Sequence, residues 1–402
     1  MKTIWSLSAR IAAQAFLALS SYVVSVSAAH SLETGALAIF FVGWTVESMW
    51  IGAIRMVLVP ALLLHDRVPR ASVLVAMGAL FATPLVVAVL IACRSLPPGT
   101  RWLLATSVLT LGAYEIARSL LSRQSTSVFT LPAADSALFV LALVGLGFAA
   151  LFSLNLFDVA LASVSGAALL LAVGIVVLLD RRDQPSSAPE DLRAWSAATW
   201  PLVRLGVLEW AVFFVTTTLG LALLGFLGGP QILAGVRLAE TLVAPIGLLS
   251  SALPYVVSGA LREDRTSTKR WPRTVRAVWL MLTTVTVLYL VGIQLVPADV
   301  LGILVGDHVA IARDASLGLA LGVVASVFGA TATLVMKHRR QVRTLSRLRS
   351  IGLAVTLPAV AIGSATGTVV GAGFGVSSSQ LFPAVVQGFL HVREVRNDAV
   401  ER

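Results

Sequence analysis

Long apolar runs, separated by short polar breaks, follow one another along the whole sequence. A helix of about 20 residues crosses the hydrocarbon core of a bilayer, so each run of that length predicts a transmembrane helix. We find twelve such runs, near residues 9–29, 35–64, 71–93, 101–122, 136–156, 158–179, 198–226, 231–260, 274–296, 312–336, 350–370 and 376–392. The pattern therefore predicts an all-α integral membrane protein with twelve transmembrane helices.

The second apolar run has a counterpart one half-chain later. Gly35 begins the second run and Gly235 lies near the start of the eighth, 200 residues apart in a chain of 402. Both runs carry acidic and basic residues and end in a charged stretch. Matching segments in the two halves of a chain are typical of transporters built from repeats. We therefore expect two parallel six-helix lobes around a central cavity.

The segment between the sixth and seventh runs is polar and rich in proline and serine, with Gln-Pro-Ser-Ser-Ala-Pro at 184–189. This composition is typical of a flexible linker. We therefore predict an N-terminal lobe at 1–180, a cytoplasmic linker at 181–197 and a C-terminal lobe at 198–402.

Composition and charge distribution support a membrane protein with a defined orientation. The chain is 57% hydrophobic and 12% charged, whereas about 25% of residues are charged in a typical soluble protein. The two termini and the gaps after even-numbered runs hold 24 of the 30 basic residues. Because cytoplasmic loops are enriched in basic residues, both termini of this multi-pass protein are expected in the cytoplasm, at the inner or plasma membrane. The net charge of +10 then reflects topology and lipid contact, and no nucleic-acid partner is expected.

Charged residues inside the apolar runs gather on the first, second, seventh and eighth predicted helices. A charge near the bilayer centre costs at least ~2.5 kcal/mol and usually marks a cavity or a partner. These helices are equivalent pairs in the two repeats, so we expect their charges to meet between the lobes. The candidates are Arg10, Arg55, Arg204 and Arg237 for substrate binding, and Glu47, Glu209 and Glu240 for ion coupling or charge balance.

Arginine in a cavity favours a phosphate-bearing substrate. Its planar guanidinium donates two parallel hydrogen bonds and keeps its charge. Arg55 has no acidic residue three or four positions away on its own helix, so its partner must come from another helix or from the substrate. A buried glutamate such as Glu47 would suit proton or cation coupling.

Structural explanations compete with these functional ones. Glu115 and Arg118 are three residues apart on the fourth predicted helix, where an ion pair would simply stabilise the helix. Arg10 would equally serve as an interfacial anchor, and Arg237 with Glu240 would equally cap the outer end of the eighth helix. Glycines at 363, 367, 371 and 375 predict close helix packing, with a break in the chain at 371–375.

Motifs for cofactor binding are missing from the sequence. It has no Walker A loop, no GxSxG, and no GxGxxG that opens a helix after a strand. Its one cysteine, Cys93, permits no intrachain disulfide, and all five histidines lie outside the apolar runs or at their ends. We therefore expect neither a cofactor nor a metal site, and transport driven by ATP would need a separate subunit.

Two segments and the twelve-run pattern together resemble a known family. They are similar to the polysaccharide-exporter, or O-antigen-type flippase, branch of the multidrug/oligosaccharidyl-lipid/polysaccharide (MOP) flippase superfamily. The two segments are Val-Leu-Gly-Ile-Leu-Val-Gly-Asp-His at 300–308 and Glu-Ile-Ala-Arg-Ser-Leu-Leu-Ser-Arg at 115–123. The resemblance implies a cavity lined by helices one, two, seven and eight. It also implies that Arg10, Arg55 and Arg204 lie on helices where the family places phosphate-contacting basic residues.

The resulting hypothesis is an ATP-independent flippase, not an enzyme. It would move a lipid-pyrophosphate-linked oligosaccharide from the cytoplasmic to the outer leaflet by alternating access, with membrane lipids, a polysaccharide polymerase and glycosyltransferases as partners. A MATE-like drug or cation antiporter is the nearest alternative, although four arginines against three glutamates on the cavity helices favour an anion. Another class, a glycosyltransferase or ligase using a polyprenyl-linked donor, would need a larger extracytoplasmic domain. A non-catalytic scaffold would not need buried charges on equivalent helices.

Overall fold

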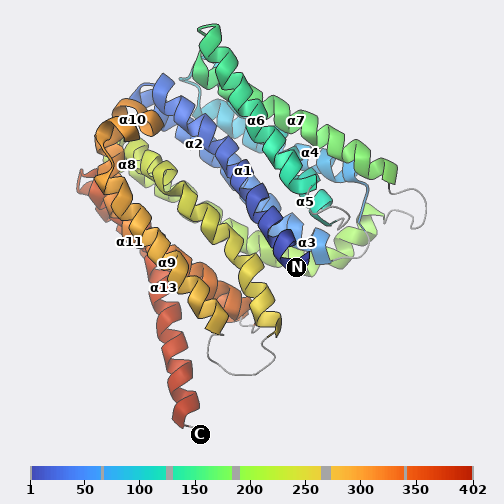
Figure 1. The fold of residues 1–402 in the computed structure, drawn as a ribbon, viewed down its shortest axis with the longest axis vertical. Helices are drawn as coiled ribbons and strands as arrows, with labels where there is room; N and C mark the ends of the chain where they lie inside the picture. Colours follow the sequence, from blue (N-terminus) through green and yellow to red (C-terminus); the bar gives the residue numbers. More distant parts are fainter. Residues whose placement is uncertain are drawn as a thin grey trace. The chain divides into compact units, whose positions relative to one another are not determined.

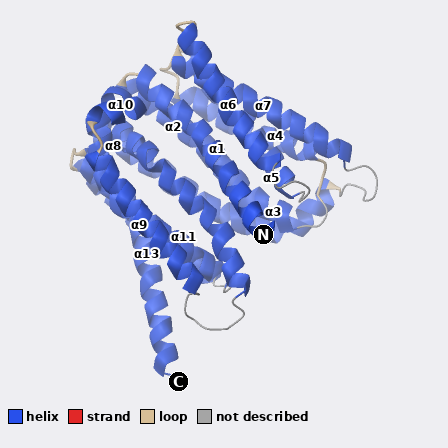
Figure 2. Cartoon of the chain, viewed as in Figure 1, coloured by secondary structure: helices blue, strands red, loops and turns tan. Residues whose placement is uncertain are grey.

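The computed structural model describes residues 2–64, 68–123, 130–182, 191–263, 273–338 and 342–400, and these residues are almost entirely α-helical, without a strand (Figures 1 and 2). The helices are α1 (Lys2–Ser31), α2 (Thr34–Ala53), the π-helical turn η1 (Ile54–Leu58), α3 (Val59–Leu64), α4 (Ala71–Ala92), α5 (Pro98–Arg123), α6 (Thr130–Leu151), α7 (Leu156–Arg182), α8 (Leu192–Glu263), α9 (Arg273–Leu295), α10 (Ala298–Val305), the 3-10 turn η2 (Gly306–His308), α11 (Val309–His338), α12 (Val342–Ala365) and α13 (Val369–Val400).

Every predicted apolar run lies mainly on these helices, although the fifth and eleventh runs extend past the ends of α6 and α12 into the turns that follow. The seventh and eighth runs share α8, which is broken at Gly229, where φ is 78° and ψ is 175°. Within the described residues, seven helical segments are long and apolar enough to cross a membrane, and three shorter apolar helices, Ala15–Ser31, Trp279–Leu295 and Ser350–Ala365, accompany them. The prediction of an all-α, multi-pass membrane protein is therefore confirmed.

The chain forms two compact units, Met1–Phe214 and Val215–Arg402. The first unit contains α1 to α7 and the beginning of α8, and the second contains the rest of α8 and all later helices. Residues 183–190 of the predicted linker lie outside the described residues, and the lobe boundary at 181–197 stays a prediction. The central cavity between the lobes also stays a prediction.

Small residues bring α12 and α13 into backbone contact in the second unit. A Cβ atom added to Gly363 of α12 would lie 2.3 Å from the carbonyl oxygen of Gly371 and 3.3 Å from the Cα atom of Gly375. The chain turns at Gly367, where φ is +68°, and α13 then begins at Val369. The predicted break at 371–375 is therefore wrong, because these glycines allow two helices to approach closely instead of ending one.

We expect Gly363→Ala to destabilise the second unit. The added methyl group would collide with backbone atoms, which cannot rotate away, so the cost should be about 1–3 kcal/mol. Gly292→Ala on α9 is the matched control, because its added Cβ meets no atom within 4 Å. Thermal unfolding of the two purified variants checks this, and equal melting temperatures would contradict the packing seen here.

Candidate functional site

Arg55 lies in a local distortion of the second predicted transmembrane helix. After α2 the chain widens into the π-helical turn η1, which contains Arg55, and α3 continues beyond it. The backbone N–H of Val59 donates to the carbonyl oxygen of Ile54, the wider spacing of a π-helix. Such single turns recur at functional sites because they change the direction in which a side chain leaves the helix.

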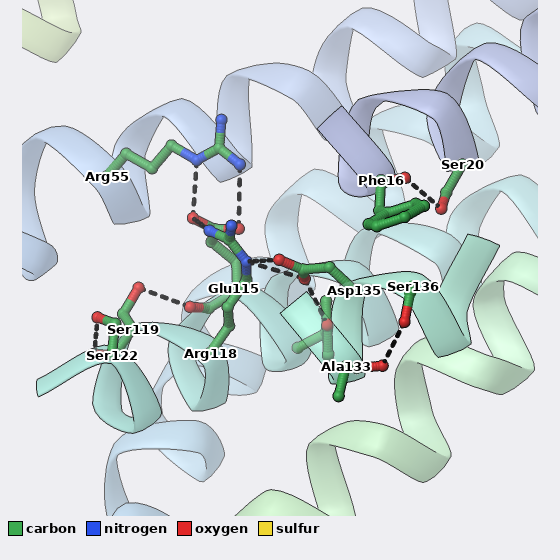
Figure 3. A network of polar contacts seen from close by, with 11 residues as sticks. Phe16, Ser20, Arg55, Glu115, Arg118, Ser119, Ser122, Ala133, Asp135 and Ser136 are labelled. Atoms are coloured by element: carbon green, nitrogen blue, oxygen red, sulfur yellow. Dashed lines mark hydrogen bonds and ion pairs between the residues drawn. The ribbon is translucent and has the colours of Figure 1, made fainter. Parts of the chain in front are cut away.

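The guanidinium of Arg55 is held by a carboxylate from another helix. Its Nε donates to Oε1 of Glu115 at 2.7 Å, and its Nη2 donates to Oε2 at 3.1 Å (Figure 3). This two-point contact is the strong geometry of an arginine–carboxylate pair. The two partners differ in exposure: the Arg55 side chain is 42% exposed, whereas that of Glu115 is 4% exposed.

Further charges continue this contact into the interior of the first unit. Nη1 of Arg118 lies 3.8 Å from Oε1 of Glu115, and Nε of Arg118 donates to both carboxylate oxygens of Asp135 at 3.0 Å. The hydroxyl of Tyr114 donates to Oδ1 of Asp135 at 2.6 Å. Positive and negative groups thus alternate along a network that is neutral as a whole, as buried charges require. We call Arg55, Tyr114, Glu115, Arg118 and Asp135 the charge network.

The predicted Glu115–Arg118 pair is only the weak link of this network. At 3.8 Å the two side chains attract each other, but Arg118 makes its hydrogen bonds to Asp135 of α6. Sequence reasoning missed Asp135, because it lies one position before the fifth apolar run. The signal was present, since α6 begins at Thr130 and Asp135 is fully buried within it.

Glu47, a predicted coupling residue, is a buried carboxylate on α2 near this network. Its side chain is 3% exposed, and the Ser48 hydroxyl donates to its Oε2 at 3.4 Å. Among the described side chains it forms no ion pair within 4 Å, although it lies close enough to Arg55 and Glu115 to interact electrostatically. Its proposed role in ion coupling stays a prediction.

The beginning of α8 packs against the segment that carries Arg55. A Cβ atom added to Gly206 would lie 2.4 Å from the carbonyl oxygen of Met56, and the indole Nε1 of Trp210 donates to the carbonyl oxygen of Met49 at 2.9 Å. Gly206 and Trp210 are four residues apart and share one face of α8. Arg204 is exposed and lies two residues from Gly206, about 200° around the helix, so it points away from this contact.

The other predicted site residues do not join the charge network among the described residues. Arg237 and Glu240 of α8, in the second unit, form an ion pair with each other. The side chains of Arg10 and Glu209 lie outside the described residues. Among the residues that the structure describes, no group of three His, Cys, Asp or Glu side chains is placed to hold a metal ion.

We expect Arg118→Met to unfold the first unit more readily than the double variant Arg118→Met with Asp135→Leu. Removing Arg118 alone leaves a fully buried carboxylate without its cation, which costs on the order of 3–5 kcal/mol, whereas replacing both partners by apolar residues is often neutral. Glu115 keeps Arg55 in either variant. Thermal unfolding and the yield of monodisperse protein measure the difference. If the double variant unfolds as readily as the single variant, the loss of stability does not come from the unpaired Asp135 carboxylate.

Comparison with known proteins places this geometry in a structural class. No protein-family model and no curated protein sequence matches the chain. Solved structures do match: lipid II flippase MurJ in an inward closed conformation has a TM-score of 0.69 and 12% identity, over 98% of this chain and 90% of that one. An inward-facing multidrug resistance MATE transporter of the MOP superfamily has a TM-score of 0.64 and 13% identity, over 96% and 95%.

A third similar structure is a MOP superfamily transporter from Pyrococcus furiosus, with a TM-score of 0.63 and 14% identity, over 100% of this chain and 96% of that one. That protein is described as having a binding pocket of reverse polarity that suggests a different function. At these identities the similarity establishes architecture and leaves activity open. The chain therefore shares its fold with these solved structures, two of which are transporters of the MOP superfamily.

Proposed function

We propose that this protein is an ATP-independent flippase that moves a lipid-pyrophosphate-linked oligosaccharide from the cytoplasmic to the outer leaflet by alternating access. The fold, shared with a lipid II flippase along nearly the whole chain, supports translocation of a lipid-linked molecule. The similar structures are transporters, which favours transport over glycosyl transfer. Membrane lipids are its surroundings, and a polysaccharide polymerase and glycosyltransferases would act before and after it.

The observation that carries this proposal is the contrast in exposure between two arginines, Arg55 and Arg204, and two carboxylates, Glu47 and Glu115, in the first unit. The Arg55 side chain is 42% exposed and Arg204 is also exposed, whereas the Glu115 side chain is 4% exposed and Glu47 is buried. A molecule that approaches these helices therefore meets guanidinium groups before it meets carboxylates. Arginine donates bidentately to phosphate oxygens, so this polarity suits a pyrophosphate anion.

The same contrast argues against a drug or cation antiporter, although MATE transporters share the fold. A cation would need accessible carboxylates or aromatic faces, because an exposed guanidinium repels it. The described carboxylates near Arg55 are buried, and Glu115 is already neutralised by Arg55 and Arg118. We therefore assign Arg55 and Arg204 to the anion, and Glu47 and Glu209 to charge balance or coupling.

Replacing Arg55 tests this function directly. In liposomes containing a fluorescent polyprenyl-pyrophosphate-linked sugar, Arg55→Ala should reduce translocation at least about tenfold, because a charge-assisted hydrogen bond to a charged group contributes about 1.5–3 kcal/mol. Arg55→Lys keeps the charge but loses the two-point fork, so it should retain part of the activity. Arg193→Ala is the matched control, since it removes an exposed arginine at the start of α8.

Two outcomes would contradict the proposal. Translocation by Arg55→Ala at the rate of the unmodified protein would remove Arg55 from substrate binding. Transport of a monovalent organic cation, with no movement of the pyrophosphate lipid, would support the antiporter alternative. In each case the variants must reach the unmodified protein's abundance in the membrane for rates to be compared.

A further inference from the structure

We propose that Glu115 is a built-in competitor of the substrate: its carboxylate occupies Arg55 when no anion is bound, and it draws Arg55 back to release the anion after translocation. The inference rests on the proposed function, in which Arg55 binds a phosphate group. It gives Glu115 a role in transport in addition to its role in stabilising the interior of the first unit. Arg55 would alternate between two anions, one belonging to the protein and one to the substrate.

The geometry of the Arg55–Glu115 contact resembles that of an arginine–phosphate contact. Two parallel N–H donors of Arg55 meet two oxygens of one carboxylate, at 2.7 and 3.1 Å. The Nε/Nη2 edge of a guanidinium can bind a phosphate in the same two-point way. A phosphate that takes this edge of Arg55 must displace the Glu115 carboxylate from it.

Exposure shows which partner is able to leave. The Arg55 side chain is 42% exposed, so it has room to reach a ligand outside the packed helices, whereas Glu115 is 4% exposed and is fixed among them. The surrounding π-helical turn also widens the helix where Arg55 emerges. The exchange is therefore mainly a movement of Arg55, while the Glu115 carboxylate stays inside the packed helices.

Arg118 has the capacity to hold Glu115 while Arg55 is away. Its Nη1 is 3.8 Å from Oε1 of Glu115, too far for a hydrogen bond, and among the described residues its buried Nη2 has no hydrogen-bond partner. A small rotation of Glu115 towards Arg118 would bring the carboxylate within hydrogen-bonding distance of this guanidinium. An unsatisfied buried donor is costly, so this shift offsets part of the loss of Arg55.

The network also supplies a force that returns Arg55. With Arg55 bound to substrate, Arg118 keeps its hydrogen bonds to Asp135, and Glu115 is the buried carboxylate that has lost its hydrogen-bonded cation. The uncompensated negative charge attracts Arg55 strongly, because charges interact more strongly away from water. A transporter must bind its cargo weakly enough to release it, and this competition limits affinity without removing specificity.

Binding measurements separate this role from a merely structural one. If Glu115 competes, only the fraction of protein with Arg55 disengaged binds tightly, and the apparent affinity falls by that fraction. Removing the carboxylate should then strengthen binding. If Glu115 only orients Arg55 for the substrate, removing it should weaken binding.

The test is a titration of the purified full-length protein in detergent with a polyprenyl pyrophosphate, using Glu115→Gln. We expect the dissociation constant to fall about tenfold, the scale of one hydrogen bond to a charged group, while the translocation rate in liposomes falls because release slows. Asp135→Asn is the matched control. It removes a buried carboxylate from the same network but not one that contacts Arg55, so affinity should not increase.

Two further variants complete the experiment. In the double variant Arg55→Ala with Glu115→Gln, the gain from Glu115→Gln should disappear, because Arg55 is the group that Glu115 withholds. If Glu115→Gln is not recovered from membranes, Glu115→Asp provides the same comparison. It keeps the charge but shortens the reach to Arg55, and it should tighten binding to a smaller extent.

The outcomes distinguish this inference from the proposed function. Unchanged or weaker binding by Glu115→Gln, or by Glu115→Asp where that replaces it, together with a loss of affinity in Arg55→Ala, would overturn competition and leave the flippase intact. No loss of affinity in Arg55→Ala would overturn both. Tighter binding by Asp135→Asn as well would show a general effect of net charge and would also overturn the specific role of Glu115.

Discussion

The need to neutralise carboxylates in a membrane interior underlies the arrangement of the first unit. Glu115 and Asp135 are almost completely shielded from solvent, and an isolated charge in such a place is too costly to persist. Arg118 lies between them and Arg55 completes the neutral set. Since these residues come from η1, α5 and α6, the same requirement ties three helical segments together and fixes where the guanidinium of Arg55 emerges.

Close backbone packing also fixes the helical segment that carries that guanidinium. Gly206 allows α8 to lie directly against Met56, the residue after Arg55, and Trp210 anchors the same face of α8 through Met49. Without hydrophobic attraction between helices in lipid, such small residues and polar contacts are what hold helices together. The η1 turn therefore has two roles: it carries Arg55, the proposed anion-binding residue, and it packs against α8.

Hydropathy predicted the fold well because a bilayer demands apolar helices of a set length, and each predicted run lies mainly in helical structure. The site was less accessible to sequence reasoning. A lone arginine without a helical neighbour indicated a distant partner for Arg55, but only three-dimensional packing identifies Glu115. Asp135 was not among the predicted site residues because it lies just before the start of the fifth apolar run. Glycines at 371–375 were read as a break, since glycine permits both a turn and close helix contact, and the choice depends on the neighbouring helix.

The most direct test of the account is a structure of the full chain in lipid nanodiscs with a polyprenyl pyrophosphate bound. The account predicts a phosphate group within hydrogen-bonding distance of the Arg55 guanidinium, the contact between Arg55 and Glu115 opened, and the Glu115 carboxylate turned towards Arg118. A headgroup bound elsewhere, with the two-point contact between Arg55 and Glu115 intact, would contradict it.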